Sequence, residues 1–302
     1  MQTVVNAGQC YNGEFMHIEI LGAGPSAVSS AEAIAIAENF ERSDVEHKMF
    51  EHFYAFFELR SIFLEAQSKQ QGRMVRFIQI RDLGRLSLTQ LQGANMGLVR
   101  KIIGSGLNNY PEVGSKAYFI NTPSFFNIVW AIVQPMLSEK ARAKTCFLSG
   151  KPHEVASELL KQARPPAIEC LTRLQHHGDA ADLTDWIARG APRGPGTEAF
   201  EYVVKHGHQQ ALVLYVPAGL ALKWTTHTTP FHAGLAHVMQ STSEHGGEVA
   251  STELTALGVQ DDVESWASPT AAVDCAVVIT LSNASSWWND RTFKLNVEWV
   301  KP

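Results

Sequence analysis

Residues 109–137 read NYPEVGSKAYFINTPSFFNIVWAIVQPML, and this stretch decides how the N-terminal half of the chain folds. The apolar run at residues 117–121 predicts a strand, and residues 124–134 predict a helix. That helix carries apolar side chains on nearly every side: Phe125, Phe126, Ile128, Val129, Trp130, Ile132 and Val133. Such a helix is either buried all round or in contact with lipid. The pattern favours an ordinary buried helix; the alternative is a helix that closes a lipid cavity and enters a membrane when it opens.

On both sides of this stretch, short apolar runs alternate with helical patterns. The predicted strands occupy residues 15–21, 74–82, 117–121 and 144–148, and the predicted helices occupy residues 27–39, 41–70, 86–103, 124–134 and 153–163. Strands that alternate with helices form a mostly parallel sheet covered by helices. The sequence therefore predicts an α/β domain in this half.

The pattern changes after residue 164. Residues 164–200 are rich in Pro and Gly, and residues 190–196 predict a linker. Beyond residue 198, β-branched and aromatic runs at 211–216, 221–226, 277–281 and 293–300 are separated by clusters of Ser, Asn, Asp and Gly. This pattern predicts a C-terminal all-β sandwich of antiparallel strands.

The composition excludes several classes of protein. Of the 302 residues, 45% are hydrophobic and 18% are charged, which excludes wholesale disorder. A net charge of -5 argues against a general nucleic-acid binder. The four cysteines have no zinc or redox spacing, so we expect reduced thiols and no metal. No apolar stretch approaches the roughly 18 residues of a membrane helix and no secretory signal begins the chain, so we expect a soluble, cytoplasmic protein.

The strand predicted at residues 74–82 carries polar side chains on both faces. Gln79 and Arg81 share one face with Phe77, whereas Asp82 lies on the other. A central strand of a parallel sheet is normally apolar on both faces. The polar residues therefore indicate either an edge strand or a face that lines a cavity.

A glycine motif points to a different chemistry. Gly22-Ala23-Gly24 follows a predicted strand and, through Ala27, leads into a predicted helix, which is the context of a dinucleotide-binding turn. The acidic residue that should end the following strand has no good candidate. A Gly/Pro turn with Ser26 capping the helix explains the same residues. A flavin- or nicotinamide-dependent oxidoreductase stays open as an alternative function.

The residues of the opening stretch resemble a known family. Residues 109–123, the pairs 125–126 and 129–130, and residues 134–137 and 141–148 resemble the hallmark run of the CRAL-TRIO lipid-binding domain. The C-terminal half is similar to a GOLD domain through residues 222–224, 271–287 and 294–298. The resemblance implies a CRAL-TRIO-like domain at residues 10–175, a linker at 176–197 and a GOLD-like β-sandwich at 198–302. From the same resemblance we expect that this sequence lacks the small helical domain that precedes the lipid domain in the family.

The resemblance implies a carrier that is not an enzyme and uses no cofactor. It would hold a phospholipid or another hydrophobic ligand in an apolar pocket of the α/β domain and transfer it between membranes. The expected pocket residues are Phe77, Gln79, Phe125, Phe126, Val129 and Trp130. The family pattern places Glu112 and Lys144 at the headgroup, as in phosphatidylinositol-transfer members. A phosphatidylinositol-type ligand is therefore the first expectation.

Some residues depart from the family pattern. Phe77 and Gln79 stand where small hydroxyl residues contact phosphocholine, and Ala141 replaces a hydroxyl residue that donates to phosphate. These departures weaken the expectation of phosphatidylcholine. The resemblance further implies transient membrane association and a protein partner for the GOLD-like part. A ligand-free interaction module remains a third possible function.

Overall fold

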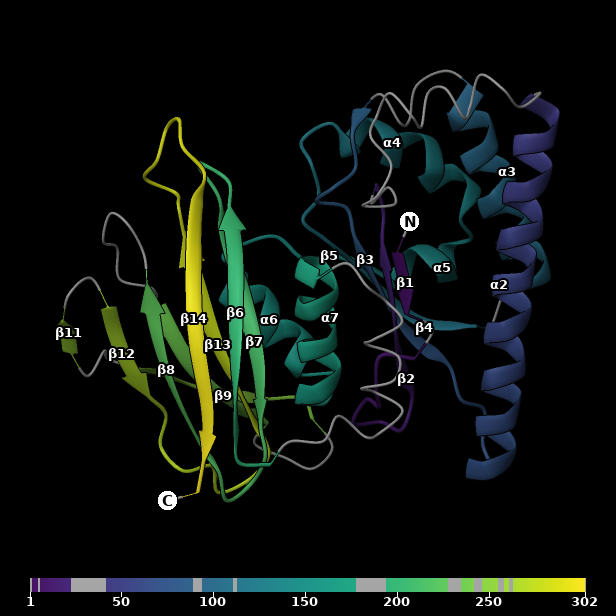
Figure 1. The fold of residues 1–302 in the computed structure, drawn as a ribbon. Coiled ribbons are helices and arrows are strands. Elements are labelled where there is room, and N and C mark those ends of the chain that lie inside the picture. The colour runs from purple at the N-terminus through teal and green to yellow at the C-terminus, as the bar shows by residue number, and fades with distance from the viewer. Residues whose placement is uncertain are drawn as a thin grey trace. The chain divides into compact units, whose positions relative to one another are not determined.

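The computed structural model describes residues 2–4, 6–22, 42–88, 94–110, 113–177, 194–227, 235–241, 246–254, 258–260 and 263–301 (Figure 1). Contacts divide the chain into two compact units. The first unit comprises Met1–Asn6 and Gly13–Ser149, and the second comprises Ala7–Asn12 and Gly150–Pro302. None of the helices in the described part of the chain is long and apolar enough to cross a membrane.

The first unit is built on one mixed sheet with the strand order β1-β2-β3-β4-β5. These strands are β1 (Gln2–Val4), β2 (Phe15–Ile20), β3 (Phe77–Asp82), β4 (Gly114–Ile120) and β5 (Thr145–Phe147). β1 runs antiparallel to β2, and the remaining neighbours are parallel. The predicted mostly parallel α/β sheet is confirmed. β3 lies in the middle of the sheet, so the edge-strand explanation of its polar residues is wrong.

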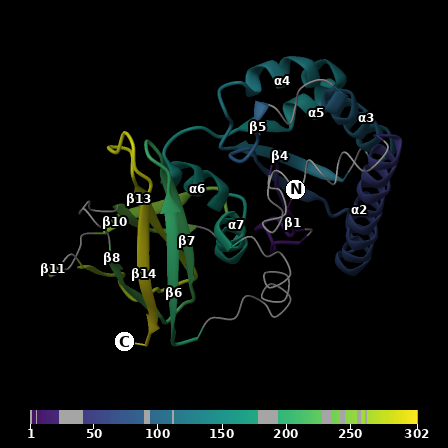
Figure 2. The same cartoon turned by 45° about the horizontal axis from the view of Figure 1, so that its top comes forward.

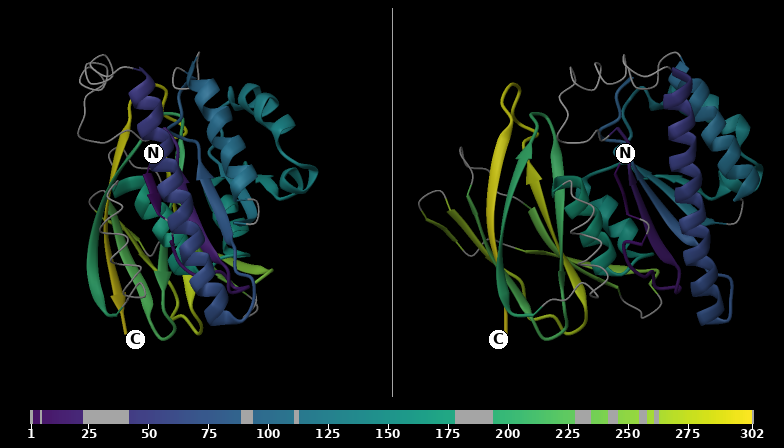
Figure 3. Two further views of the ribbon diagram at one scale, coloured as in Figure 1. Left: turned by 90° about the vertical axis from the view of Figure 1, so that its right-hand side faces the viewer. Right: turned by 45° about the vertical axis from the view of Figure 1, so that its right-hand side comes forward.

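Four α-helices and a 3-10 turn complete the described part of this unit. They are α2 (Arg42–Gln71), α3 (Ala94–Asn109), α4 (Phe126–Val133), the turn η2 (Gln134–Met136) and α5 (Glu139–Ala143). α2 runs alongside the strands (Figure 3). Phe56 of α2 contacts His17 of β2, and Phe63 contacts Phe15. The helix predicted at residues 27–39 lies outside the described residues.

The first helices of the second unit are α6 (Pro152–Leu160) and α7 (Pro165–His177), which lie beside the sheet that contains β7 (Figure 2). The division into compact units places both helices with the C-terminal strands, whereas the sequence analysis assigned residues up to 175 to the first domain. The domain limits themselves stay a prediction. The sequence analysis did not predict α7, because Pro165 and Pro166 suggested irregular structure. Proline is tolerated in the first turn of a helix, where the backbone N–H has no partner within the helix.

Two antiparallel sheets form the rest of the second unit, with the strand orders β10-β9-β13-β7 and β11-β12-β8-β14-β6. The strands are β6 (Gly196–Val204), β7 (Gln209–Val216), β8 (Ala221–His227), β9 (Leu235–Ser241), β10 (Val249–Leu254), β11 (Gly258–Gln260), β12 (Val263–Ala267), β13 (Cys275–Ser282) and β14 (Arg291–Val300). Side chains from both sheets share one core, in which the Trp224 and Trp266 rings stack 5.7 Å apart. The indole N–H of Trp299 donates to the Tyr215 carbonyl at 2.9 Å. The predicted all-β C-terminal half is confirmed.

Candidate functional site

The turns at the ends of β3 and β4 determine where α4 begins. Asp82 Oδ1 accepts hydrogen bonds from the Gly84 backbone N–H at 2.8 Å and from Asn121 Nδ2 at 3.0 Å. Asn121 has a φ of 52°, a left-handed conformation that asparagine tolerates better than most residues. The chain then turns at Pro123, whose carbonyl accepts from the Phe126 N–H at 2.9 Å. This turn places the aromatic start of α4 above the sheet.

α4 packs one side against the sheet and exposes Ile128 on the other. Phe126 and Val129 are buried, and the Phe119 ring of β4 lies 5.8 Å from the Phe126 ring and 6.2 Å from the Trp130 ring. On the other side of the helix, Ile128 is 64% exposed. The expectation of an ordinary buried helix is therefore wrong, because the packed surface covers only one side. α4 therefore has one packed apolar side and, on its other side, one exposed isoleucine.

The residues predicted to line the pocket fall into two clusters on one face of the sheet. Phe125, Phe126, Val129 and Trp130 pack with Phe119 and Leu83 beneath α4. Phe77 is fully buried beneath α2, where its ring stacks 5.6 Å from Phe63. Gln79 is buried on the same face of β3 as Phe77. The structure thus places Phe77 in a packed core rather than on a cavity wall.

Arg81 lies between the two clusters. Its guanidinium is 5.5 Å from the centre of the Phe119 ring, and its Nη2 donates to Gln79 Oε1 at 3.2 Å. The Arg81 side chain is 32% exposed. The polar face of β3 noted in the sequence therefore forms the floor between α2 and α4.

This floor contains a buried charge cluster that sequence reasoning missed. Glu19 Oε2 accepts from Arg81 Nε at 2.8 Å, and Glu19 Oε1 lies 3.4 Å from Arg60 Nη1 of α2. His17 Nε2 lies 3.0 Å from Glu19 Oε1. The Arg60 side chain is only 3% exposed, and its Nε has no hydrogen-bond partner among the described residues. Alternating polar residues at positions 17 and 19 of an otherwise apolar strand were the available signal.

Burial and neighbouring charges decide the charge of this cluster. Burial alone would raise the pKa of Glu19, but Arg81, the hydrogen bond from His17 and Arg60 together hold that pKa below its usual range. Burial lowers the pKa of His17, so the ring is neutral at pH 7 and donates to Glu19. Burial also lowers the pKa of Arg60 to about 10, which leaves it charged. Among these four side chains one positive charge is in excess, and Arg81 is the accessible arginine.

The structure describes one of the two residues that were predicted to contact the headgroup. Lys144 caps the C-terminus of α5, is half-buried, and donates through Nζ to the Gly114 carbonyl at 2.9 Å. Glu112 lies outside the described residues. The pairing of these two side chains around a headgroup stays a prediction.

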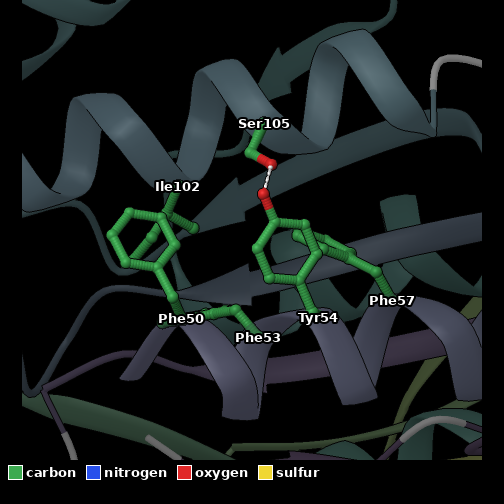
Figure 4. A pocket seen from close by; sticks show the side chains of 6 residues that line it. All are labelled: Phe50, Phe53, Tyr54, Phe57, Ile102 and Ser105. Atoms are coloured by element: carbon green, nitrogen blue, oxygen red, sulfur yellow. Dashed lines mark hydrogen bonds between the residues drawn. The ribbon is translucent and has the colours of Figure 1, made fainter. Parts of the chain in front are cut away.

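A small pocket lies between α2 and α3 (Figure 4). It is lined by Phe50, Phe53, Tyr54, Phe57, Ile102 and Ser105, and the space between these side chains is too small for a water molecule. The Tyr54 hydroxyl and Ser105 Oγ lie 2.6 Å apart at its wall. Pockets for small molecules usually measure about 300–1,000 Å³, so these side chains form no lipid-sized cavity in this structure. The sequence analysis did not predict it, since helical spacing alone does not show which helix Phe53 and Phe57 would face.

The glycine motif has a packing explanation at its first residue. Gly22 has a φ of +76°, and a Cβ there would lie 2.2 Å from the Arg85 carbonyl oxygen. Only glycine fits this turn after β2. Gly24 and Ala27 lie outside the described residues. Within the described part of the chain, no group of three or more His, Cys, Asp or Glu side chains is placed to hold a metal ion.

Comparison with known proteins identifies relatives of the first half of the chain. The model of the CRAL/TRIO domain matches residues 33–169. Patellin-6 of Arabidopsis thaliana is 25% identical over 154 residues, which cover 51% of this chain and 34% of that protein. Patellin-4 of the same plant is 29% identical over 105 residues, covering 35% of this chain and 19% of that protein. The CRAL-TRIO domain-containing protein T23G5.2 of Caenorhabditis elegans is 30% identical over 80 residues, covering 26% of this chain and 11% of that protein. The chain thus spans about a third or less of the length of these relatives.

Solved structures resemble the chain only weakly. The crystal structure of Sfh5 is 23% identical, covers 24% of this chain and 26% of that one, and has a TM-score of 0.22. The periplasmic lysozyme inhibitor PliG of Aeromonas hydrophila is 11% identical, covers 36% of this chain and 90% of that one, and has a TM-score of 0.23. Both TM-scores are too low to relate the complete folds.

Proposed function

We propose that the chain, whose residues 33–169 match the model of the CRAL/TRIO domain, binds one lipid molecule without covalent chemistry and transfers it between membranes. The observation that carries the proposal is the two-sided character of α4. Its aromatic side packs on Phe119 of β4 and on Leu83, while Ile128 faces outward. The proposal includes a cytoplasmic protein that meets membranes only transiently.

Ligand uptake requires α4 to separate from β4. Phe126, Val129 and Trp130 now fill the space beside Phe119, so acyl chains would replace these side-chain contacts. The exchange costs little hydrophobic free energy, because both the helix and the acyl chains stay out of water. α4 ends where η2 begins at Gln134, and Pro135 has no N–H to continue the helix. A short helix flanked by Pro123 and Pro135 can move as one segment.

The polar end of the ligand is proposed to reach Lys144, with phosphatidylinositol as the first candidate. The hydrogen bond to the Gly114 carbonyl uses one of the three N–H donors of the ammonium group. The half-buried position of Lys144 strengthens its attraction for a phosphate relative to an exposed lysine. Glu112 is proposed to accept from the inositol hydroxyls.

Native mass spectrometry after incubation with mixed liposomes tests the function. We expect one lipid per chain, enriched in phosphatidylinositol. Lys144→Ala should abolish that enrichment, whereas Lys140→Ala, which removes an exposed lysine of the same helix, should not. Wild-type chains that stay empty would contradict lipid carriage and favour a ligand-free interaction module. Equal enrichment in both variants would contradict only the role of Lys144.

An oxidoreductase remains the alternative from a different class. It would bind flavin or a nicotinamide nucleotide through Gly22 and Gly24. A visible-absorbance scan of the purified chain detects a bound flavin directly. We also propose that the β-sandwich is a GOLD-like adaptor that contacts a protein partner.

A further inference from the structure

The connection between β13 and β14 displays two adjacent tryptophans to solvent. Trp287 is 83% exposed and Trp288 is 87% exposed. In Figure 1 this connection projects beyond the end of the strands in the second unit. Single exposed apolar residues are common, but two neighbouring indoles make a patch of roughly 400 Å². A patch of that size on one projecting loop indicates a binding function.

Hydrogen bonds hold this loop in shape. Asn283 is fully buried, and its Nδ2 donates to the carbonyls of Val204 and Asn289, both at 2.9 Å. Ser286 Oγ donates to the same Asn289 carbonyl at 2.8 Å. The tryptophans are therefore carried by a turn whose two ends are fixed on the sandwich.

The neighbouring loop between β6 and β7 is joined to this turn. The Gly207 N–H donates to the Asn283 carbonyl at 3.0 Å, and the Asn283 N–H donates to the His208 carbonyl at 2.9 Å. Residues 205–208 and 283–290 thus form one unit, which we call the tryptophan tip. Because the tip is already ordered, docking it to a partner costs little conformational entropy.

The charges on the tryptophan tip nearly cancel. The backbone N–H and the Nδ1 of His206 both lie 3.1 Å from Asp290 Oδ1. These hydrogen bonds hold the pKa of Asp290 below its usual range, so it is a carboxylate at pH 7. Lys205 supplies the opposing positive charge. A surface without net charge and with two indoles fits a zwitterionic interface better than a strongly charged one.

We propose that the tryptophan tip inserts Trp287 and Trp288 into the headgroup region of a lipid bilayer. Indole rings favour this depth because the ring is apolar while its N–H keeps a polar partner. A protein partner fits less well, since the patch is about half of what each side buries in a stable complex. The tip would anchor the chain through the β-sandwich, independently of ligand binding in the first unit.

Vesicle flotation of the full chain tests the anchor. We expect wild type to float with phosphatidylcholine vesicles, and Trp287→Ala/Trp288→Ala to bind roughly tenfold more weakly or worse. Val273→Ala is the matched control, because Val273 is 49% exposed and precedes β13 at the end of that strand away from the tip. It should bind as wild type does. Brominated phosphatidylcholine should quench more tryptophan emission in wild type than in the double variant.

Several outcomes would overturn the anchor. The anchor is overturned if the wild-type chain does not bind the vesicles. It is also overturned if the double variant floats as well as wild type while its circular dichroism is unchanged. A wild-type dimer that the double variant loses would assign the tip to self-association instead. Loss of lipid pickup with vesicle binding intact would contradict the proposed carrier function but leave the anchor standing.

Discussion

Glu19→Gln should destabilise the first unit strongly. The substitution keeps the size of the side chain but removes the negative charge that lies 2.8 Å from Arg81 and 3.4 Å from Arg60. Removing one partner of a buried pair costs about 3–5 kcal/mol, because the other charge stays buried without compensation. Arg81 is 32% exposed and can turn toward water, whereas Arg60 is 3% exposed and cannot. We therefore expect the free energy of unfolding to fall by about 3 kcal/mol, the low end of that range.

Hydrogen exchange of the β2 and β3 peptides in urea measures this loss within the first unit. Glu65→Gln is the matched control: Glu65 pairs with Lys69 at 2.6 Å on the exposed side of the same unit, and its loss should not be detectable. Adding Arg60→Met to Glu19→Gln should restore most of the stability, because an apolar side chain of similar size then replaces the orphaned charge. A loss below about 1 kcal/mol, the value of one ordinary hydrogen bond, would refute the reasoning.

Three further predictions concern acid, α4 and the glycine turn. The pKa of Glu19 in the folded chain lies below its ordinary value of 4.5, so the unfolded chain binds more protons as the pH falls below 4.5. The free energy of unfolding should therefore decrease as acid is added. Glu19→Gln should flatten this pH dependence in acid titrations of unfolding. Ile128→Asp should slow transfer of a fluorescent phospholipid between vesicles without changing the free energy of unfolding; reduced stability would mean that Ile128 is packed. Gly22→Ala should lower the free energy of unfolding, measured in urea, by more than about 1 kcal/mol, because the added Cβ would meet the Arg85 carbonyl at a positive φ. An unchanged free energy of unfolding would favour the cofactor explanation of the motif.

Local pattern was enough for much of the fold. Apolar runs located β2 through β5, and the apolar residues after Pro123 located α4, because these signals depend only on neighbouring residues. The two-sheet sandwich followed from strands separated by turn residues. Helix α7 was missed because two prolines read as a break, although they begin the helix.

The sequence by itself determined the alternation of strands and helices from β2 to β5 and the resemblance of that segment to the CRAL/TRIO domain, since both depend on spacing along the chain. Only the tertiary structure decided which residues far apart in the sequence contact one another. Arg60 meets Glu19 across 41 positions, and β3 lies in the middle of its sheet with its polar face between α2 and α4. Which side of α4 is buried also depended on where the sheet lies. Burial and electrostatic pairing join residues far apart in the chain, so no local pattern contains them.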